Sequence, residues 1–249
     1  MKIIFFTADD PIYLPSLFER VLGERGSETA AVCVVPPLYK GQNRLRATSR
    51  YYRTFGVAAT VRLASRVALA KARRQSIASV AERHGVPWRT VVDVNAPSLL
   101  AWTAAQQPDV IVSVSCPQIF RQPLLELPRL GCLNIHGAIL PQYRGVMPSF
   151  WMLANGEQRA GVSIYFMDER IDAGDLCGQR TFEIEPDETL DGFLRHSKHV
   201  AAELLLDVLR EIERGSVTRH PLDLANGSYY SWPDRQAVDR FRATGRRLW

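Results

Sequence analysis

The chain has 249 residues, of which 46% are hydrophobic and 23% are charged. These values are typical of soluble globular domains, and they exclude disordered, collagen-like and disulfide-scaffold proteins. No stretch approaches the roughly 18 apolar residues that a membrane span needs, and the N-terminal residues lack the apolar core of a signal peptide, so we expect a cytoplasmic protein. The formal net charge is +5, yet ten basic and no acidic residues lie between Lys40 and Arg74. Subtracting these ten charges leaves −5 for the rest of the chain.

The first half of the chain alternates short apolar runs with amphipathic segments. Strands are expected at 2–7, 29–35, 88–92, 110–114 and 132–135, and helices at 14–22, 97–106 and 123–127. One or two further helices, broken near Gly56, are expected between 42 and 83. This alternation predicts an α/β fold with a doubly wound, mostly parallel sheet that helices cover on both faces. Ligands bind at the carboxyl ends of such strands, which draws attention to the loops after Thr7, Val114 and Ile135.

The second half predicts two more strands, at 162–167 and 176–182, around an acidic loop. A long amphipathic helix is expected at 189–214, ending before Gly215. We therefore expect one catalytic domain over 1–215, with a basic helical insertion at about 40–83. The remaining residues, 216–249, are aromatic and basic without clear periodicity. They are expected to form a short C-terminal extension that packs on the domain and could close the seam of a homodimer.

A strand that ends at Gly137 carries Asn134 and His136 two positions apart. Side chains at i and i+2 of a strand share a face, so an amide and an imidazole project together. The amide can stabilise a developing oxyanion and the imidazole can move protons, which suits acyl transfer. The acidic loop downstream contains Asp172. Its other carboxylates, from Asp168, Glu169 and Asp175, are expected to be mainly solvated.

Asn-x-His, the following Leu-Pro-x-Tyr-Arg-Gly and the later Ile-Asp-Ala-Gly-Asp together resemble the 10-formyltetrahydrofolate-dependent formyltransferases. The resemblance keeps register from Val110 to Gln179 and extends more loosely over the rest of the core. It implies a Rossmann-like fold and 10-formyltetrahydrofolate as co-substrate. No metal is expected, because Cys132 and His136 alone cannot complete a zinc site, which needs four ligands. The resemblance also implies that the catalytic residues are Asn134, His136 and Asp172. The residues that it implies for folate binding are Pro117, Gln118, Ile119, Phe120, Ala138, Ile139, Leu140, Pro141 and Asp168.

The resemblance implies that a formyl group is transferred to a primary amine. Only 34 residues follow Gly215, fewer than the C-terminal β-barrel domain of methionyl-tRNA formyltransferases needs, which favours an amino sugar carried on a nucleotide. Such an acceptor could place its phosphates on arginines and stack on Tyr229, Tyr230 and Trp232. The alternatives are methionyl-tRNA or another small amine as acceptor, and a non-catalytic folate- or nucleotide-binding protein. The first turn, 7–10, lacks the Gly-rich phosphate loop of the glycinamide ribonucleotide enzymes.

Three interpretations of the basic segment stay open: a solvated helix, a wall that binds substrate phosphates, and a surface that rests on anionic lipid. Tyr143 and Arg144 are expected to brace the catalytic loop, and Arg144 could also contact a substrate phosphate. The four cysteines, Cys33, Cys116, Cys132 and Cys177, contain no Cys-x-x-Cys pair and are expected to be reduced core thiols. His196 and His199 lie on one helix face, where we expect them to be packed or partly exposed.

Overall fold

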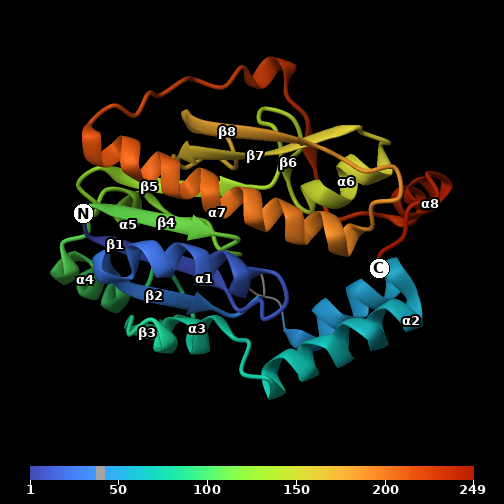
Figure 1. Ribbon diagram of the computed structural model, residues 1–249, viewed down its shortest axis with the longest axis horizontal. Coiled ribbons are helices and arrows are strands. Elements are labelled where there is room, and N and C mark those ends of the chain that lie inside the picture. The colour runs from blue at the N-terminus through green and yellow to red at the C-terminus, as the bar shows by residue number, and fades with distance from the viewer. Residues whose placement is uncertain (38–42) are drawn as a thin grey trace.

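The computed structural model describes residues 1–37 and 43–249, and within them it confirms a mostly parallel α/β sheet. Seven strands lie in the order β3-β2-β1-β4-β5-β7-β8 (Figure 1). They are β1 (Ile3–Ala8), β2 (Thr29–Val35), β3 (Trp88–Thr90), β4 (Val110–Val114), β5 (Gly131–His136), β7 (Arg159–Phe166) and β8 (Leu176–Glu183). The first five are parallel, whereas β7 runs antiparallel to β5, and β8 to β7. The strand order reverses between β1 and β4, where doubly wound sheets open a ligand crevice.

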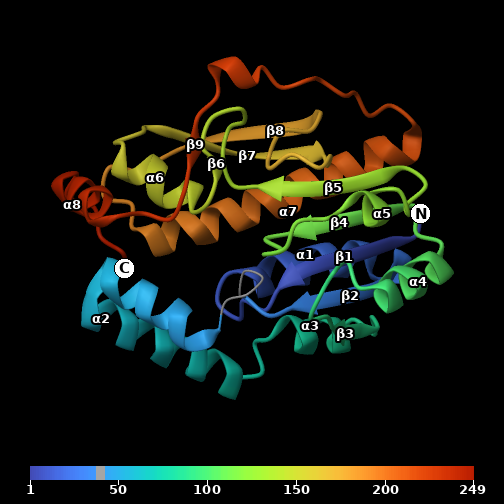
Figure 2. The same cartoon turned by 180° about the vertical axis from the view of Figure 1, so that it is seen from behind.

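Helices cover both faces of this sheet, as Figures 1 and 2 show. One face carries α1 (Leu14–Arg25), α3 (Ile77–Arg83) and α7 (Leu190–Arg214), and the other carries α4 (Pro97–Gln106) and α5 (Gln122–Leu125). Strand β1 shows why both faces of the sheet are covered. Its successive side chains point to opposite faces, and both sets are mainly apolar. Phe5 belongs to the apolar cluster of the first face and Phe6 to that of the second, and neither is exposed.

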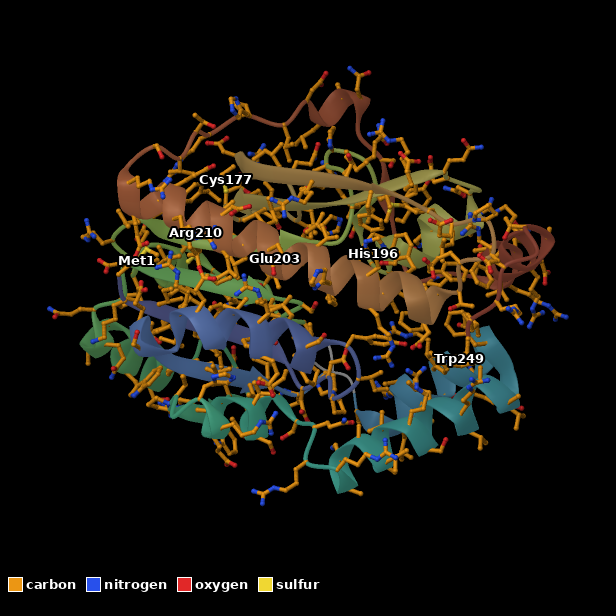
Figure 3. The ribbon with its side chains drawn as sticks, viewed as in Figure 1. Met1, Cys177, His196, Glu203, Arg210 and Trp249 are labelled. Carbon is orange, nitrogen blue, oxygen red and sulfur yellow. The ribbon has the colours of Figure 1, made fainter. Side chains whose placement is uncertain are left out.

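Ion pairs link α1 to α7, and two of them are partly exposed to solvent. Arg20 Nε lies 2.6 Å from Glu203 Oε1, and Arg210 Nη2 lies 2.8 Å from Glu24 Oε1. Figure 3 labels Glu203 and Arg210 on α7, on the side that faces α1. All four side chains are about a third exposed or more, so these pairs contribute little stability compared with the apolar core beneath them.

A third apolar cluster joins α6 (Pro148–Ala154), α8 (Arg235–Ala243) and the inner face of α2 (Arg44–Ala72). Phe150 stacks on Phe241 with ring centres 5.2 Å apart and meets the edge of Phe55 at 5.7 Å. Helix α8 lies in the segment for which the sequence predicted no periodic element. Its buried residues, Ala237, Val238 and Phe241, share one narrow face, which a nine-residue helix shows only weakly in sequence.

The remaining elements are short. The two-residue strands β6 (Arg144–Gly145) and β9 (Tyr229–Tyr230) pair in parallel, and one-turn helices occupy Gly26–Glu28 and Leu224–Asn226. The break expected near Gly56 is confirmed, because that residue has φ +87° and interrupts α2. Lys40, which the sequence assigned to the basic insertion, lies outside the described residues. Among the described residues, no helix is both long enough and apolar enough to cross a membrane.

Candidate active site

The three residues expected to be catalytic converge on the wall of one cavity of about 880 Å³. Strand β5 delivers Asn134 and His136 to its carboxyl end, and the loop between β7 and β8 delivers Asp172. His136 Nδ1 lies 3.6 Å from Asp172 Oδ1, and the two side chains are only 7% and 10% exposed. The amide, the imidazole and the distant acid that the sequence pattern indicates thus meet in one place.

Tyr165, which the sequence analysis did not single out, connects two of these residues. It lies directly opposite Asn134 in the antiparallel pair of β5 and β7. Asn134 Nδ2 donates a hydrogen bond to Tyr165 Oη at 2.9 Å, and that hydroxyl donates to Asp172 Oδ1 at 2.9 Å. Burial and the neighbouring charge of Asp172 raise the pKa of Tyr165 well above its usual value, so the phenol keeps its proton.

Backbone groups hold His136 and Asp172 in this arrangement. His136 Nε2 lies 2.8 Å from the carbonyl oxygen of Tyr143, which can only accept, so Nε2 carries a hydrogen and Nδ1 is left to face Asp172. Asp172 Oδ2 accepts a hydrogen bond from the backbone N–H of Gly145 at 2.8 Å. Gly145 has φ +95°, and a Cβ atom there would collide with the carbonyl oxygen of Tyr230. A glycine is therefore needed where the chain approaches the carboxylate.

The segment Ala138–Pro141, which the resemblance implied for folate binding, does not line the cavity. Ser163 Oγ donates to the carbonyl oxygen of Ala138 at 2.7 Å and accepts from Leu140 N at 3.0 Å. Gln179 Nε2 donates to the carbonyl oxygen of Leu140 at 3.1 Å. These bonds tie the segment to β7 and β8, where Ala138 and Leu140 are buried. It supports the loop that carries Tyr143, and its place in folate binding stays a prediction.

The segment Pro117–Phe120 does line the cavity, as the resemblance implied. Gln118 accepts from Val94 N at 3.0 Å and donates to the carbonyl oxygen of Val92 at 2.7 Å, so its side chain braces the wall. Ile119 is 58% exposed at the rim, whereas Phe120 is buried. Asp168 also lines the cavity, where its carboxylate accepts hydrogen bonds from the Arg170 side chain, the shortest of them 2.5 Å.

A second group of polar residues lines the same cavity. Asp10 follows β1, Ser115 follows β4, and Lys198 lies on α7. Lys198 Nζ donates to Ser115 Oγ at 3.2 Å. Burial lowers the pKa of Lys198 while the charge of Asp10 opposes the shift, and burial raises the pKa of Asp10 against two backbone hydrogen bonds. The sequence indicated the loops after β1 and β4, but a single lysine on a long helix gives no signal of its own.

The tail contributes one exposed aromatic ring to the cavity. Tyr229 lines it and is 53% exposed. Tyr230 instead stacks on Tyr143 with ring centres 5.2 Å apart, and Trp232 packs under the guanidinium of Arg50 at 4.1 Å. Of the three aromatic residues expected to offer stacking faces, only Tyr229 is therefore free to contact a ligand.

Arg144 and the two helix histidines lie outside the cavity. The Arg144 guanidinium is 5.8 Å from the ring centre of Tyr229 on the β6–β9 pair, so it braces the loop and lines no ligand surface. The rings of His196 and Phe182 are 4.4 Å apart, and His196 and His199 are otherwise exposed. Among the described residues, no group of three or more potential metal ligands occurs.

All four cysteines are free, and three of them are buried. Cys116 is half-buried and lines the cavity, which the expectation of core thiols did not include. Burial raises the pKa of Cys116 to about 12. The side chain is therefore a neutral thiol near pH 7 and is a poor nucleophile.

Comparison with known proteins gives matches over most of the chain. A family model described as "Formyl transferase" matches residues 1–209. Methionyl-tRNA formyltransferase of Geobacter metallireducens is 39% identical over 150 residues, which is 60% of this chain and 48% of that protein. The enzyme of the same name from Thermotoga maritima is 35% identical over 153 residues, 61% of this chain and 49% of that protein. The chain spans about half the length of these curated relatives.

Solved structures share the fold at lower identity. A 4-N formyltransferase from Francisella tularensis superposes with a TM-score of 0.61 at 21% identity, covering 97% of this chain and 87% of that one. An N-formyltransferase from Helicobacter canadensis, in complex with folinic acid and dTDP-3-aminofucose, gives 0.60 at 19% identity, covering 95% and 72%. These similarities extend over nearly the whole chain and concern its fold. Together with the family match over residues 1–209, they lead to one conclusion: the chain belongs to the formyl transferase family.

Proposed function

We propose that this protein transfers a formyl group from 10-formyltetrahydrofolate to a primary amine. The observation that carries the proposal is the convergence of Asn134, His136 and Asp172 on one cavity in a member of this family. A cavity of about 880 Å³ lies within the usual range for small-molecule sites, so it has room for the reacting parts of both substrates. A folate- or nucleotide-binding protein without activity would not need these three side chains together.

Asn134 is suited to donate a hydrogen bond to the oxygen of the formyl group. Its amide nitrogen has two N–H groups and gives one to Tyr165, which leaves the other for a ligand. That N–H would bind the formyl oxygen most strongly as negative charge builds on it during attack by the amine. Where comparable donors have been deleted from oxyanion holes, the loss is about 3–4 kcal/mol of transition-state stabilisation.

His136 and Asp172 are suited to moving the proton. The acceptor nitrogen forms a bond to the formyl carbon, the bond from that carbon to N10 of the folate breaks, and one proton passes from the acceptor nitrogen to N10. His136 can take and return this proton at Nδ1, because Nε2 is held by the Tyr143 carbonyl. The Asp172 carboxylate, 3.6 Å away, would stabilise the imidazolium while it exists.

The two substrates would contact different residues of the cavity lining. Pro117–Phe120 and Asp168 form the wall proposed for the pterin ring. Lys198 and Tyr229 lie elsewhere on the lining and would meet a phosphate and a base or sugar of the acceptor. We propose a nucleotide-linked amino sugar as this acceptor. Residues 1–215 would then act as the catalytic unit, with 216–249 supplying Tyr229.

Methionyl-tRNA is the second candidate acceptor. The identity of 39% over 150 residues to a methionyl-tRNA formyltransferase favours it, and so does the basic segment, since phosphate backbones attract such patches. A cytoplasmic location, which the sequence leads us to expect, and a homodimer, whose seam the C-terminal extension could close, stay predictions.

A panel assay tests the proposal. The purified protein is incubated with 10-formyltetrahydrofolate and, in separate reactions, nucleotide amino sugars, methionyl-tRNA and free amines, while release of tetrahydrofolate is followed. We expect release with one acceptor class, and a formylated product of matching mass. Release without any acceptor would identify a hydrolase instead. Asp172→Asn and His136→Asn serve as matched variants, and undiminished rates in both would overturn the proposed roles.

A further inference from the structure

Helix α2 has an outward surface that the rest of the molecule does not cover. Its two limbs, which meet at Gly56, project from the side of the sheet beside α8 and the C-terminus (Figures 1 and 2). The inner side packs through Phe55, Ala59 and Ala70, which are buried. Figure 3 shows Trp249 beside α2, and the guanidinium of Arg62 lies 5.0 Å from the centre of its ring.

The outer side of the second limb is apolar along its length. Val57, Val61, Ala64 and Ala68 are exposed and follow one another at intervals of four, three and four residues, which places them in one row on the helix. Val57 and Val61 are 61% and 62% exposed, and Leu69 beside the row is 50% exposed. The first limb adds two more large apolar side chains, since Leu45 is 81% exposed and Tyr52 50%. We call these seven residues the outer α2 face.

Basic side chains flank this face. Arg46, Arg53 and Arg73 are all exposed, and no acidic residue occurs anywhere from 43 to 74. Arg66, by contrast, turns inward and lies 2.5 Å from Asp191. The charged side chains that α2 exposes are therefore all basic. A partner that matches their charge must be anionic.

We propose that the outer α2 face docks the protein on the surface of an anionic membrane. Exposed valine and leucine side chains gain from entering the acyl boundary, and the flanking arginines gain from the phosphates of the headgroups. A lipid surface meets both requirements along the whole helix. A second copy of the chain would set two acid-free helices against each other, so like charges would oppose that contact.

Contacts between α2 and the cavity wall connect the proposed docking surface to the active-site cavity. Asp191 accepts hydrogen bonds from Arg66 of α2 and, at 2.8 Å, from the hydroxyl of Tyr13, which lines the cavity. This chain of contacts fixes α2 to the cavity wall. A protein held on its outer α2 face would therefore keep the cavity in a fixed position relative to the lipid surface.

Vesicle flotation with the full chain tests this inference. The protein is mixed with vesicles of phosphatidylcholine alone or of phosphatidylcholine with phosphatidylglycerol, and the fraction that floats is measured at low and high salt. We expect flotation with the anionic vesicles only, and a marked decrease when salt shortens the screening length. An equal, salt-independent distribution between both vesicle types would overturn the inference.

Paired variants separate the apolar contribution from the charge. The double variant Val61→Ser/Leu69→Ser keeps every charge and should lower partitioning by at least about tenfold, since two apolar side chains no longer enter the lipid. Arg53→Gln/Arg73→Gln should lower it at low salt. The matched controls are Val92→Ser and Arg214→Gln, which change an exposed valine and an exposed arginine elsewhere and should leave partitioning unchanged.

Circular dichroism verifies that each variant stays folded, and sedimentation velocity without lipid separates docking from self-association. If the controls reduce flotation as much as the α2 variants do, binding comes from general charge and the inference is wrong. If the wild type is a dimer that Val61→Ser/Leu69→Ser dissociates, a second copy covers the face, and that also overturns it.

Discussion

The hydroxyl of Tyr165 donates a hydrogen bond to Asp172 Oδ1 across 2.9 Å. The same oxygen accepts from Asn134 Nδ2, so one buried phenol fixes both the amide and the carboxylate. Asp172 Oδ1 is thereby shared between Tyr165 and the imidazole of His136. The geometry of the proposed catalytic residues depends on this side chain, although Tyr165 transfers no proton in the proposed reaction.

Tyr165→Phe should therefore act as a positioning variant. The ring stays in place, but the amide and the carboxylate lose a common partner. Hydrogen bonds to charged groups contribute about 1.5–3 kcal/mol, so we expect kcat to fall by roughly ten- to hundredfold while KM for 10-formyltetrahydrofolate changes little. Steady-state kinetics measures both. Tyr230→Phe removes a hydroxyl that bonds to Asn155 outside the cavity, and an equal loss in that control would refute a specific role.

Replacing Asn134 by Ala should remove the proposed donor to the formyl oxygen. By analogy with oxyanion-hole deletions, kcat should fall by about 100- to 1000-fold. Asn134→Asp should lose as much, because a carboxylate cannot donate and repels the developing charge. Folate binding, followed by fluorescence, should persist in both variants. An Asn134→Asp enzyme close to wild-type activity would show that the side chain does not contact the oxyanion.

Lys198 predicts how the affinity for an acceptor phosphate depends on pH. Burial lowers the pKa of its ammonium group, so the positive charge is lost at a lower pH than for an ordinary lysine. If the charge holds an acceptor phosphate, affinity must weaken as the pH rises, and it must do so at a lower pH than an ordinary lysine would give. Calorimetry with a nucleotide sugar that lacks the amine isolates this effect from ionisation of the amine. Lys198→Arg should remove the pH dependence, since arginine stays protonated, and a retained dependence would assign it to another group.

Cys116 should resist alkylation although it lines the cavity. With its pKa raised to about 12, the reactive thiolate is scarce near pH 7. Mass spectrometry after brief iodoacetamide treatment should find Cys116 largely unmodified in the folded protein and all four cysteines modified in urea. Rapid labelling of the folded protein would mean that this side chain is more accessible and more acidic than the structure shows.

Local patterns predict much of the fold and three of the site residues. The Asn-x-His spacing on a strand and the acidic loop are both local. The residues themselves therefore point to Asn134 and His136, and the family resemblance singles out Asp172 among the carboxylates of the loop. Neither points to Tyr165, because the role of that residue arises from the antiparallel register of β5 and β7, which no pattern within either strand specifies. Lys198 likewise reaches the cavity only through the packing of α7.

The segment Ala138–Pro141 lies close to a proposed catalytic residue in sequence but outside the cavity lining. It adjoins His136 in sequence, and the family resemblance implies a place for it in the folate pocket. Its environment is decided by Ser163 and Gln179 on two later strands, whose side chains bind its backbone and turn it away from the cavity. Proximity along the chain to a catalytic residue therefore does not predict a place in the cavity lining.

Gly145 provides the last prediction, on stability. Its N–H binds Asp172, its φ is +95°, and a Cβ there would meet the carbonyl oxygen of Tyr230. Gly156 has φ +75° but open space around its Cβ position, so Gly156→Ala measures the backbone strain alone, about 1–2 kcal/mol. Gly145→Ala should cost clearly more in urea unfolding, because the β6–β9 pair must also separate, and it should lower kcat by displacing the donor to Asp172. If both variants lose the same free energy of unfolding, the loop accommodates the added methyl group and does not hold the carboxylate of Asp172 in place.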